Sequence, residues 1–159
     1  MTDIEFMQLC RDIGQVLQPD RPTILCDEGE IKIDGVNVAL FFDAENAPDL
    51  VCCYVDLGEI CQENRTEAYQ ALLTMNLLSG TKTTGVYSID PESGNAIFIV
   101  QFPDPDDLDG ALMAELFRLY AAQAAGMRGA ILAGEAPDPA TVRAFFPMPG
   151  AGMPMANLA

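Results

Sequence analysis

The stretch EIKIDGVNVALFF at residues 30–42 outlines two strands and the turn between them. Residues 30–33 alternate polar and apolar side chains, a pattern typical of a half-buried strand. The dipeptide Asp34-Gly35 follows, and Asp-Gly between two such runs is a strong signal for a two-residue hairpin turn. We therefore predict that residues 30–33 and 36–42 pair as antiparallel strands.

The second of these strands carries apolar side chains on both faces. One face holds Val36, Val38, Leu40 and Phe42, and the other holds Ala39 and Phe41. An antiparallel sheet commonly packs against helices with one face only. One apolar face is therefore expected to be left for a partner, and the alternation leaves open which of the two it is.

Further short apolar runs on either side of this hairpin extend the sheet. Residues 23–27 and 50–55 are bounded by acidic turns, and residues 85–89 and 96–102 form a second hairpin around the loop 90–95. The sequence thus predicts an antiparallel, twisted sheet.

Residues 3–17 have the three- and four-residue periodicity of a helix with one buried stripe. The stripe consists of Phe6, Leu9, Cys10, Ile13, Val16 and Leu17. Ile4 and Met7 fall on the opposite, polar side of this helix. They are either ordinary surface hydrophobes or residues that a partner covers.

A second helix is predicted from residue 64 to residue 78, and little of its surface is polar. A helix that is apolar nearly all round is buried on more than one side. In a chain this short the second side is expected to be another subunit, and a C2 homodimer is the default arrangement. The predicted interface residues are Ala68, Tyr69, Leu72, Leu73, Met75 and Asn76.

A third helix is predicted from residue 108 to the region of Gly126 and Gly129. Its expected buried stripe is Leu108, Leu112, Leu116, Leu119, Tyr120 and Met127. Proline and glycine then become frequent, so we predict one domain over residues 1–135 and a mobile Pro, Gly and Met-rich tail over 136–159. The tail holds apolar residues that would anchor it to an apolar surface: Phe145, Phe146, Met148, Met153 and Met155.

The charge of the chain limits its partners. Its 159 residues include 24 Asp plus Glu against 8 Lys plus Arg, a net charge of −16. Such a field repels nucleic acids and anionic lipid surfaces, and no run of about 18 apolar residues is present to span a membrane. The acidic N-terminus is unlike a signal peptide, so we expect no nucleic acid, no membrane insertion and no signal-peptide export.

Residues that commonly carry catalysis are scarce. Histidine is absent and the five cysteines include no C-x-x-C pair, so the cysteines are expected to be reduced core residues. The acidic runs 27–30 and 104–109 do not match the ligand order of a calcium loop, and no phosphate-binding glycine motif occurs. We predict no catalytic residue, no metal site and no cofactor.

Five stretches, taken with their order, carry a resemblance to a known family. They are FMQLCRDIG at 6–14, IKIDG at 31–35, VALFF at 38–42, ALLTMN at 71–76 and GVYSID at 85–90. This order in a small acidic chain resembles the class I type III secretion chaperones of the CesT, or Tir-chaperone, family. Two features depart from that pattern: the tail beyond residue 136, and Gly58-Glu59-Ile60-Cys61 where the family has a leucine-rich turn.

The resemblance implies an α+β fold of order α-β-β-β(-β)-α-β-β-α, a homodimer and a bacterial cytoplasmic location. It also implies a non-catalytic chaperone that binds the N-terminal segment of a secreted effector in extended form and keeps it soluble. The candidate effector-binding residues are Ile4, Met7, Val38, Leu40 and Phe42.

Two other function classes are compatible with the composition. The first is an acidic nucleic-acid mimic that blocks a basic protein surface, which would gather its acids on one face and lose binding in salt. The second is an enzyme built from carboxylates alone, which needs two acids converging in a pocket.

Overall fold

A computed structural model of the chain describes residues 1–79 and 85–133, and the predicted tail therefore lies outside the described residues. The helices are α1 (Asp3–Leu17), α2 (Ile24–Glu28), α3 (Arg65–Ser79) and α4 (Gly110–Leu132), with short 3-10 turns η1 (Gln62–Asn64) and η3 (Pro105–Asp107). The strands are β1 (Glu30–Ile33), β2 (Val36–Asp43), β3 (Ala47–Glu59), β4 (Gly85–Ile89) and β5 (Asn95–Pro103). The predicted α+β fold class is confirmed.

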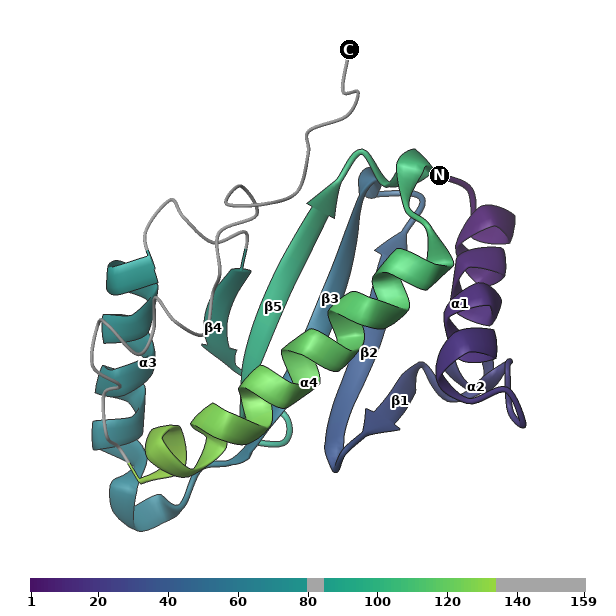
Figure 1. Cartoon of the computed structure of the whole chain (residues 1–159). Coiled ribbons are helices and arrows are strands. Elements are labelled where there is room, and N and C mark those ends of the chain that lie inside the picture. The colour runs from purple at the N-terminus through teal and green to yellow at the C-terminus, as the bar shows by residue number, and fades with distance from the viewer. Residues whose placement is uncertain (80–84, 134–159) are drawn as a thin grey trace, which may run out of the picture.

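The five strands form one sheet in the order β1-β2-β3-β5-β4, and every neighbouring pair is antiparallel (Figure 1). Helices α1 and α4 lie on one face of this sheet, and α3 stands beyond β4 at its edge (Figure 1). The core between helices and sheet contains fully buried Ile13, Val38, Val55 and Phe117. The covered face of the sheet is therefore the one that carries Val38.

The first hairpin forms as predicted. Asp34 and Gly35 both have positive φ angles, 49° and 84°, which is the backbone of the two-residue type I′ turn. The register places Ile33 opposite Val36 and Ile31 opposite Val38. The second predicted hairpin is also confirmed, because β4 and β5 pair with Ile89 opposite Ala96.

The strand predicted at residues 23–27 is wrong, because these residues form the short helix α2. A short apolar run fits a strand or a buried helical turn equally well. Here Gly29 ends the helix in the left-handed conformation with φ 76°, and its N–H bonds the Leu25 carbonyl at 3.1 Å. Ile24 and Leu25 then enter the core from a helix.

The predicted buried stripe of the third helix is also wrong in part. In α4 the buried residues are Met113, Ala114, Phe117, Ala121, Ala124 and Met127, whereas Leu112 and Leu119 are exposed. The segment is apolar on nearly every side, so periodicity did not discriminate between neighbouring faces. Among the described residues, no helix is long and apolar enough to span a membrane.

Candidate functional site

The face of the sheet opposite α1 and α4 has no helix packed on it within the described part of the chain. Its side chains are therefore half-buried or exposed rather than buried. We call this surface the open face. Its apolar members are Ala39, Phe41, Leu50, Cys52, Tyr54, Val86, Ile97 and Ile99.

Strand register brings four of these residues into one row. Ala39 lies opposite Tyr54, Tyr54 opposite Ile99, and Ile99 opposite Val86. The row thus crosses β2, β3, β5 and β4 without a polar side chain. Neighbouring strands are about 4.8 Å apart, so the row is an apolar stripe roughly 14 Å long.

Two large side chains of the open face project into solvent. Phe41 is 55% exposed and Val86 is 51% exposed. The Phe41 ring meets the Tyr54 ring edge-on, with 6.5 Å between their centroids. This pair holds an aromatic surface in place near one end of the stripe.

A cavity of about 450 Å³ hollows the open face beside the stripe. Ala39, Tyr54 and Ile97 supply its apolar lining. Pro91 also lines it. The polar residues of the lining are Glu30, Asn37, Asp56, Asp90, Ser93 and Asn95. A cavity lined by apolar side chains and by three carboxylates suits a segment that carries both apolar and basic side chains.

Hydrogen bonds fix two of the three rim carboxylates. Asp56 accepts from the Gly58 N–H at 2.7 Å and from the Asn95 side-chain amide at 3.1 Å. The Ser93 hydroxyl and the N–H groups of Glu92 and Ser93 donate to Asp90, and they hold its pKa below the ordinary value. The Asp90 carboxylate is therefore charged at neutral pH.

The structure corrects part of the predicted effector-binding set. Val38 and Leu40 are buried under the helices, and the Phe42 ring packs against Phe6 of α1 at 5.4 Å between centroids. All three residues belong to the covered face, where Val38 and Leu40 have almost no exposed surface and Phe42 is half-buried. The sequence left open which face of strand 36–42 is uncovered. In the structure it is the face of Ala39 and Phe41.

Ile4 and Met7 are exposed on α1 as expected, Ile4 at 83%. They lie on the helical side of the sheet, so the structure does not bring them together with the open face (Figure 1). Tyr54, Val86, Ile97 and Ile99 were not among the binding residues predicted from the sequence. Their alternation within each strand was visible, but only the register shows that Tyr54, Ile99 and Val86 share one row with Ala39.

The predicted interface residues of α3 divide into two sets. Ala68, Leu72 and Met75 are buried in their own chain, so they cannot also line an interface in this conformation. Tyr69 and Leu73 are exposed, and Leu77, exposed at 80%, follows on the same helix.

Asn76 has a role within its own chain. Its side-chain amide donates to the Tyr87 carbonyl at 2.9 Å, and its carbonyl oxygen accepts from the Tyr87 N–H at 2.7 Å. This pairing binds α3 to the outer edge of β4.

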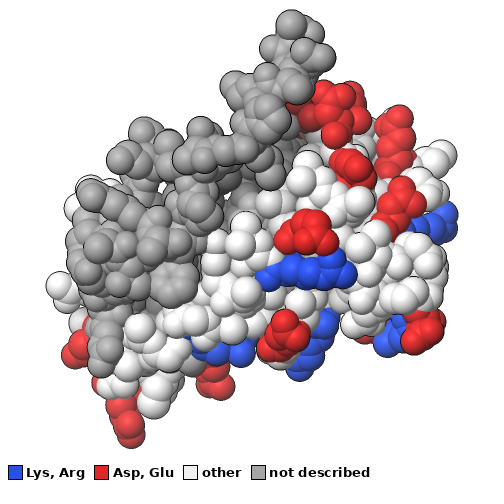
Figure 2. Space-filling view, viewed as in Figure 1, with Lys and Arg blue, Asp and Glu red and all other residues white. Residues whose placement is uncertain are grey.

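Charge on the helical side of the molecule is mixed. Figure 2 shows Asp and Glu side chains scattered there among Lys, Arg and neutral residues rather than gathered in one patch. Several basic residues on this part of the chain pair with nearby acids, such as Arg21 with Glu28 and Arg118 with Glu115.

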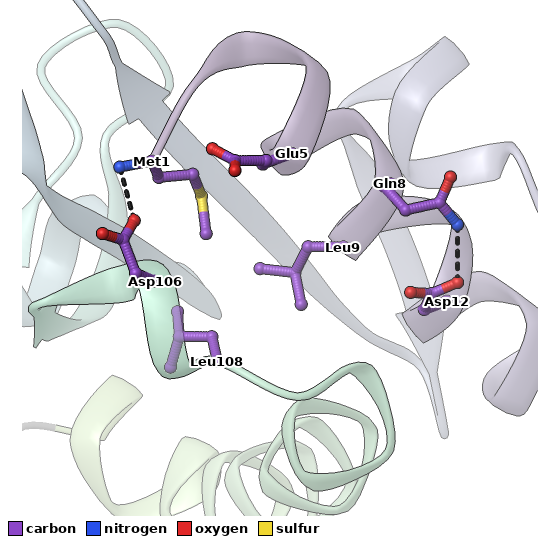
Figure 3. A pocket seen from close by; sticks show the side chains of 7 residues that line it. All are labelled: Met1, Glu5, Gln8, Leu9, Asp12, Asp106 and Leu108. Atoms are coloured by element: carbon purple, nitrogen blue, oxygen red, sulfur yellow. Dashed lines mark hydrogen bonds and ion pairs between the residues drawn. The ribbon is translucent and has the colours of Figure 1, made fainter.

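A second hollow, of about 230 Å³, lies between α1 and η3 (Figure 3). Its carboxylates already have partners within the chain. Asp106 pairs with the N-terminal amine at 2.6 Å, Asp12 accepts from Gln8 at 2.8 Å, and Glu5 accepts from the Thr2 N–H at 2.7 Å. These pairs stabilise the start of α1 and its contact with η3.

The buried thiols are poorly suited to chemistry at neutral pH. Burial raises the pKa of Cys10 to about 12 and also raises the pKa of Cys53. Among the described residues there is no group of three Cys, Asp or Glu that would hold a metal ion. The arrangement on the open face is suited to binding an extended apolar segment.

No protein-family model matches the sequence, and the comparison with curated proteins found no match. A chain in the crystal structure of the ExsC-ExsE complex has a similar structure, with a TM-score of 0.52 and 15% sequence identity. The match covers 77% of this chain and 96% of that chain. At this level of identity, the likeness shows a shared fold.

Proposed function

We propose that this protein is a non-catalytic type III secretion chaperone of the class I type. It binds the N-terminal segment of a secreted effector in extended form on the open face, and so keeps that segment soluble and competent for secretion. The fold shared with a chain of the ExsC-ExsE complex supports the class of function.

The observation that carries this proposal is the row Ala39, Tyr54, Ile99 and Val86 on the sheet face that no described helix covers. Contiguous exposed apolar surface commonly marks an interaction site. An extended segment laid along the stripe buries its apolar side chains on the row. Basic side chains of the same segment then reach Glu30, Asp56 and Asp90 around the cavity.

The acidic nucleic-acid mimic is less well supported. Such a protein presents carboxylates as its contact surface, in place of phosphates. In the cavity of the open face the carboxylates are mixed with the apolar side chains Ala39, Tyr54 and Ile97, and on the helical side they are interspersed with basic residues (Figure 2). Apolar contact therefore has the larger share of the binding surface.

The proposal includes a homodimer in the bacterial cytoplasm. The exposed residues Tyr69, Leu73 and Leu77 on α3 are suited to a self-complementary contact, because they present apolar surface that the described chain does not cover. Such a contact leaves the open face of each subunit accessible.

Light scattering of the protein, alone and co-expressed with the protein encoded beside it, tests the proposed function. We expect a mass near twice 17.1 kDa that rises by one partner per dimer. The complex should survive about 0.5 M NaCl, where the Debye length falls to roughly 4 Å. A partner that dissociates at this salt concentration would favour the acidic mimic, and a protein that takes up no partner would contradict the chaperone proposal.

A further inference from the structure

The chain carries a candidate occupant of its own open face. We propose that residues 142–155, VRAFFPMPGAGMPM, bind the open face of the same chain and compete there with an incoming partner segment. The competition rests on the proposed function, whereas the intramolecular contact does not.

Charge is the first argument for this contact. The protein has 24 acidic residues, but none follows Asp138. The only charged side chain beyond that point is Arg143. The tail is thus the part of the chain best matched to an apolar surface with Glu30, Asp56 and Asp90 around its cavity.

The apolar content of the segment is the second argument. Five large apolar side chains are gathered in it: Phe145, Phe146, Met148, Met153 and Met155. Pro147, Pro149 and Pro154 have no backbone N–H, so the segment is ill suited to add as a strand at a sheet edge. It is better suited to lie across the side chains of a sheet face.

The end of α4 is anchored close to the cavity. Arg128 donates to the Leu57 carbonyl at 2.9 Å and to the Asp56 carbonyl at 3.3 Å, and Asp56 also lines the cavity. The described chain ends at Ala133, a few residues later. The sequence continues for 26 residues beyond Ala133. A random coil of about that length has a typical end-to-end distance of roughly 28 Å, enough to return along the sheet.

The tether makes even a weak contact effective. A segment joined by a short flexible linker has an effective concentration in the millimolar range. When the tail occupies the open face of most molecules, the apparent affinity for a partner falls in proportion to the fraction of molecules whose open face is unoccupied. The tail would therefore hold the site covered until a tighter-binding partner displaces it.

The labelling rate of Cys52, which lies on the open face, shows whether the tail covers that face. The measurement needs no partner protein. We compare the rate of maleimide labelling of Cys52, resolved by peptide mass spectrometry, in the full chain and in the full-length variant with Phe145→Ala and Phe146→Ala. The exposed Cys61 lies outside the open face and serves as an internal control. The buried Cys10 and Cys53 report any loss of folding.

We expect Cys52 in the variant to label at least about threefold faster than in the unaltered chain, with Cys61 unchanged. A matched tail variant, Thr141→Ala with Asn157→Ala, should label like the unaltered chain. Equal Cys52 rates in all three proteins would overturn the contact. Slow labelling of Cys52 that becomes fast when the protein is diluted would also overturn the intramolecular contact. The tail would then be binding the open face of a second copy of the chain.

The second measurement is the affinity of the protein for the partner segment. With the tail contact weakened, we expect the N-terminal peptide of the protein encoded beside this chain to bind about three- to tenfold more tightly. Unchanged affinity would overturn the competition. Protection of Cys52 with no peptide binding in any variant would contradict the proposed function alone, and peptide binding with unprotected Cys52 would contradict the tail contact alone.

Discussion

Asn76 illustrates how one side chain completes the sheet. The outward N–H and C=O of an edge strand are a template for unwanted strand pairing, and proteins commonly cover or block them. The Asn76 amide bonds both groups of Tyr87, as a neighbouring strand would. Behind it the Tyr87 ring is buried against Phe98, with 4.7 Å between centroids. The sequence placed Asn76 at a subunit interface because nothing in a helical pattern indicates a contact with a strand backbone.

Replacement of Asn76 by alanine should destabilise the protein by about 1–3 kcal/mol, because the Tyr87 backbone groups lose their partners. Urea unfolding followed by circular dichroism measures this change. Asn37→Ala, on the open face, is the matched control and should change the free energy of unfolding by less than about 0.5 kcal/mol. Equal effects of the two substitutions would contradict the role given to Asn76.

Asp90 gives the β4–β5 turn a dependence on pH. Its pKa is held below the ordinary value of 3.8, chiefly by the Ser93 hydroxyl. A carboxylate with a lowered pKa in the folded state contributes stability above that ordinary value and loses it as the pH falls through the folded pKa.

The advantage of the unaltered chain over Asp90→Asn should therefore be present at about pH 5 and shrink as the pH falls below about 4. Urea midpoints across this range measure it, with Glu92→Gln as a control for simple removal of charge. A difference between the two proteins that does not vary with pH would contradict this assignment.

At the scale of elements, the sequence predicts structure best where two signals agree. Helix α1 has an apolar stripe followed by Pro19, and the first hairpin has alternation around Asp34-Gly35; both elements form as predicted, although Val16 of the predicted α1 stripe is exposed. Where one signal stood alone, the prediction was wrong: a short apolar run became α2 rather than a strand. In α4 an apolar surface all round hid which stripe faces the core.

The packing of α4 can be tested through Phe117, the largest of its buried side chains. Phe117→Ala should cost about 3–5 kcal/mol of stability, because it removes the aromatic ring and leaves a cavity. Leu119→Ala on the exposed side should cost less than about 1 kcal/mol. The reverse order in urea unfolding would mean that α4 packs with the stripe predicted from periodicity.

At the scale of the whole molecule, α1 and α4 gather on one face of the sheet, and no helix of residues 1–79 and 85–133 packs on the other (Figure 1). The sequence indicated that one apolar face of strand 36–42 would be uncovered, but not which one. That choice depends on where α1 and α4 lie, and a local pattern carries no such long-range information. Exposure of Ile4 and Met7 was predictable because it is a property of one helix.

The proposed dimer is also a property of the whole molecule. Aspartate at both Leu73 and Leu77 would place charge on the exposed side of α3, where Leu73 is 69% exposed. We expect this double variant to have the monomer mass of 17.1 kDa in light scattering. Leu112→Asp on α4 is the control and should keep the dimer mass. A double variant that remains dimeric would place the interface elsewhere.

The most direct test of the account is the affinity of the open face for an extended partner segment. Fluorescence anisotropy measures binding of a labelled N-terminal peptide from the protein encoded beside this chain. Phe41→Asp removes apolar contact and adds an unpaired charge, so we expect at least about a tenfold loss of affinity. Leu119→Asp, on the helical side, should bind like the unaltered chain. Equal affinities for the Phe41→Asp variant and the unaltered chain would contradict the open face as the binding site.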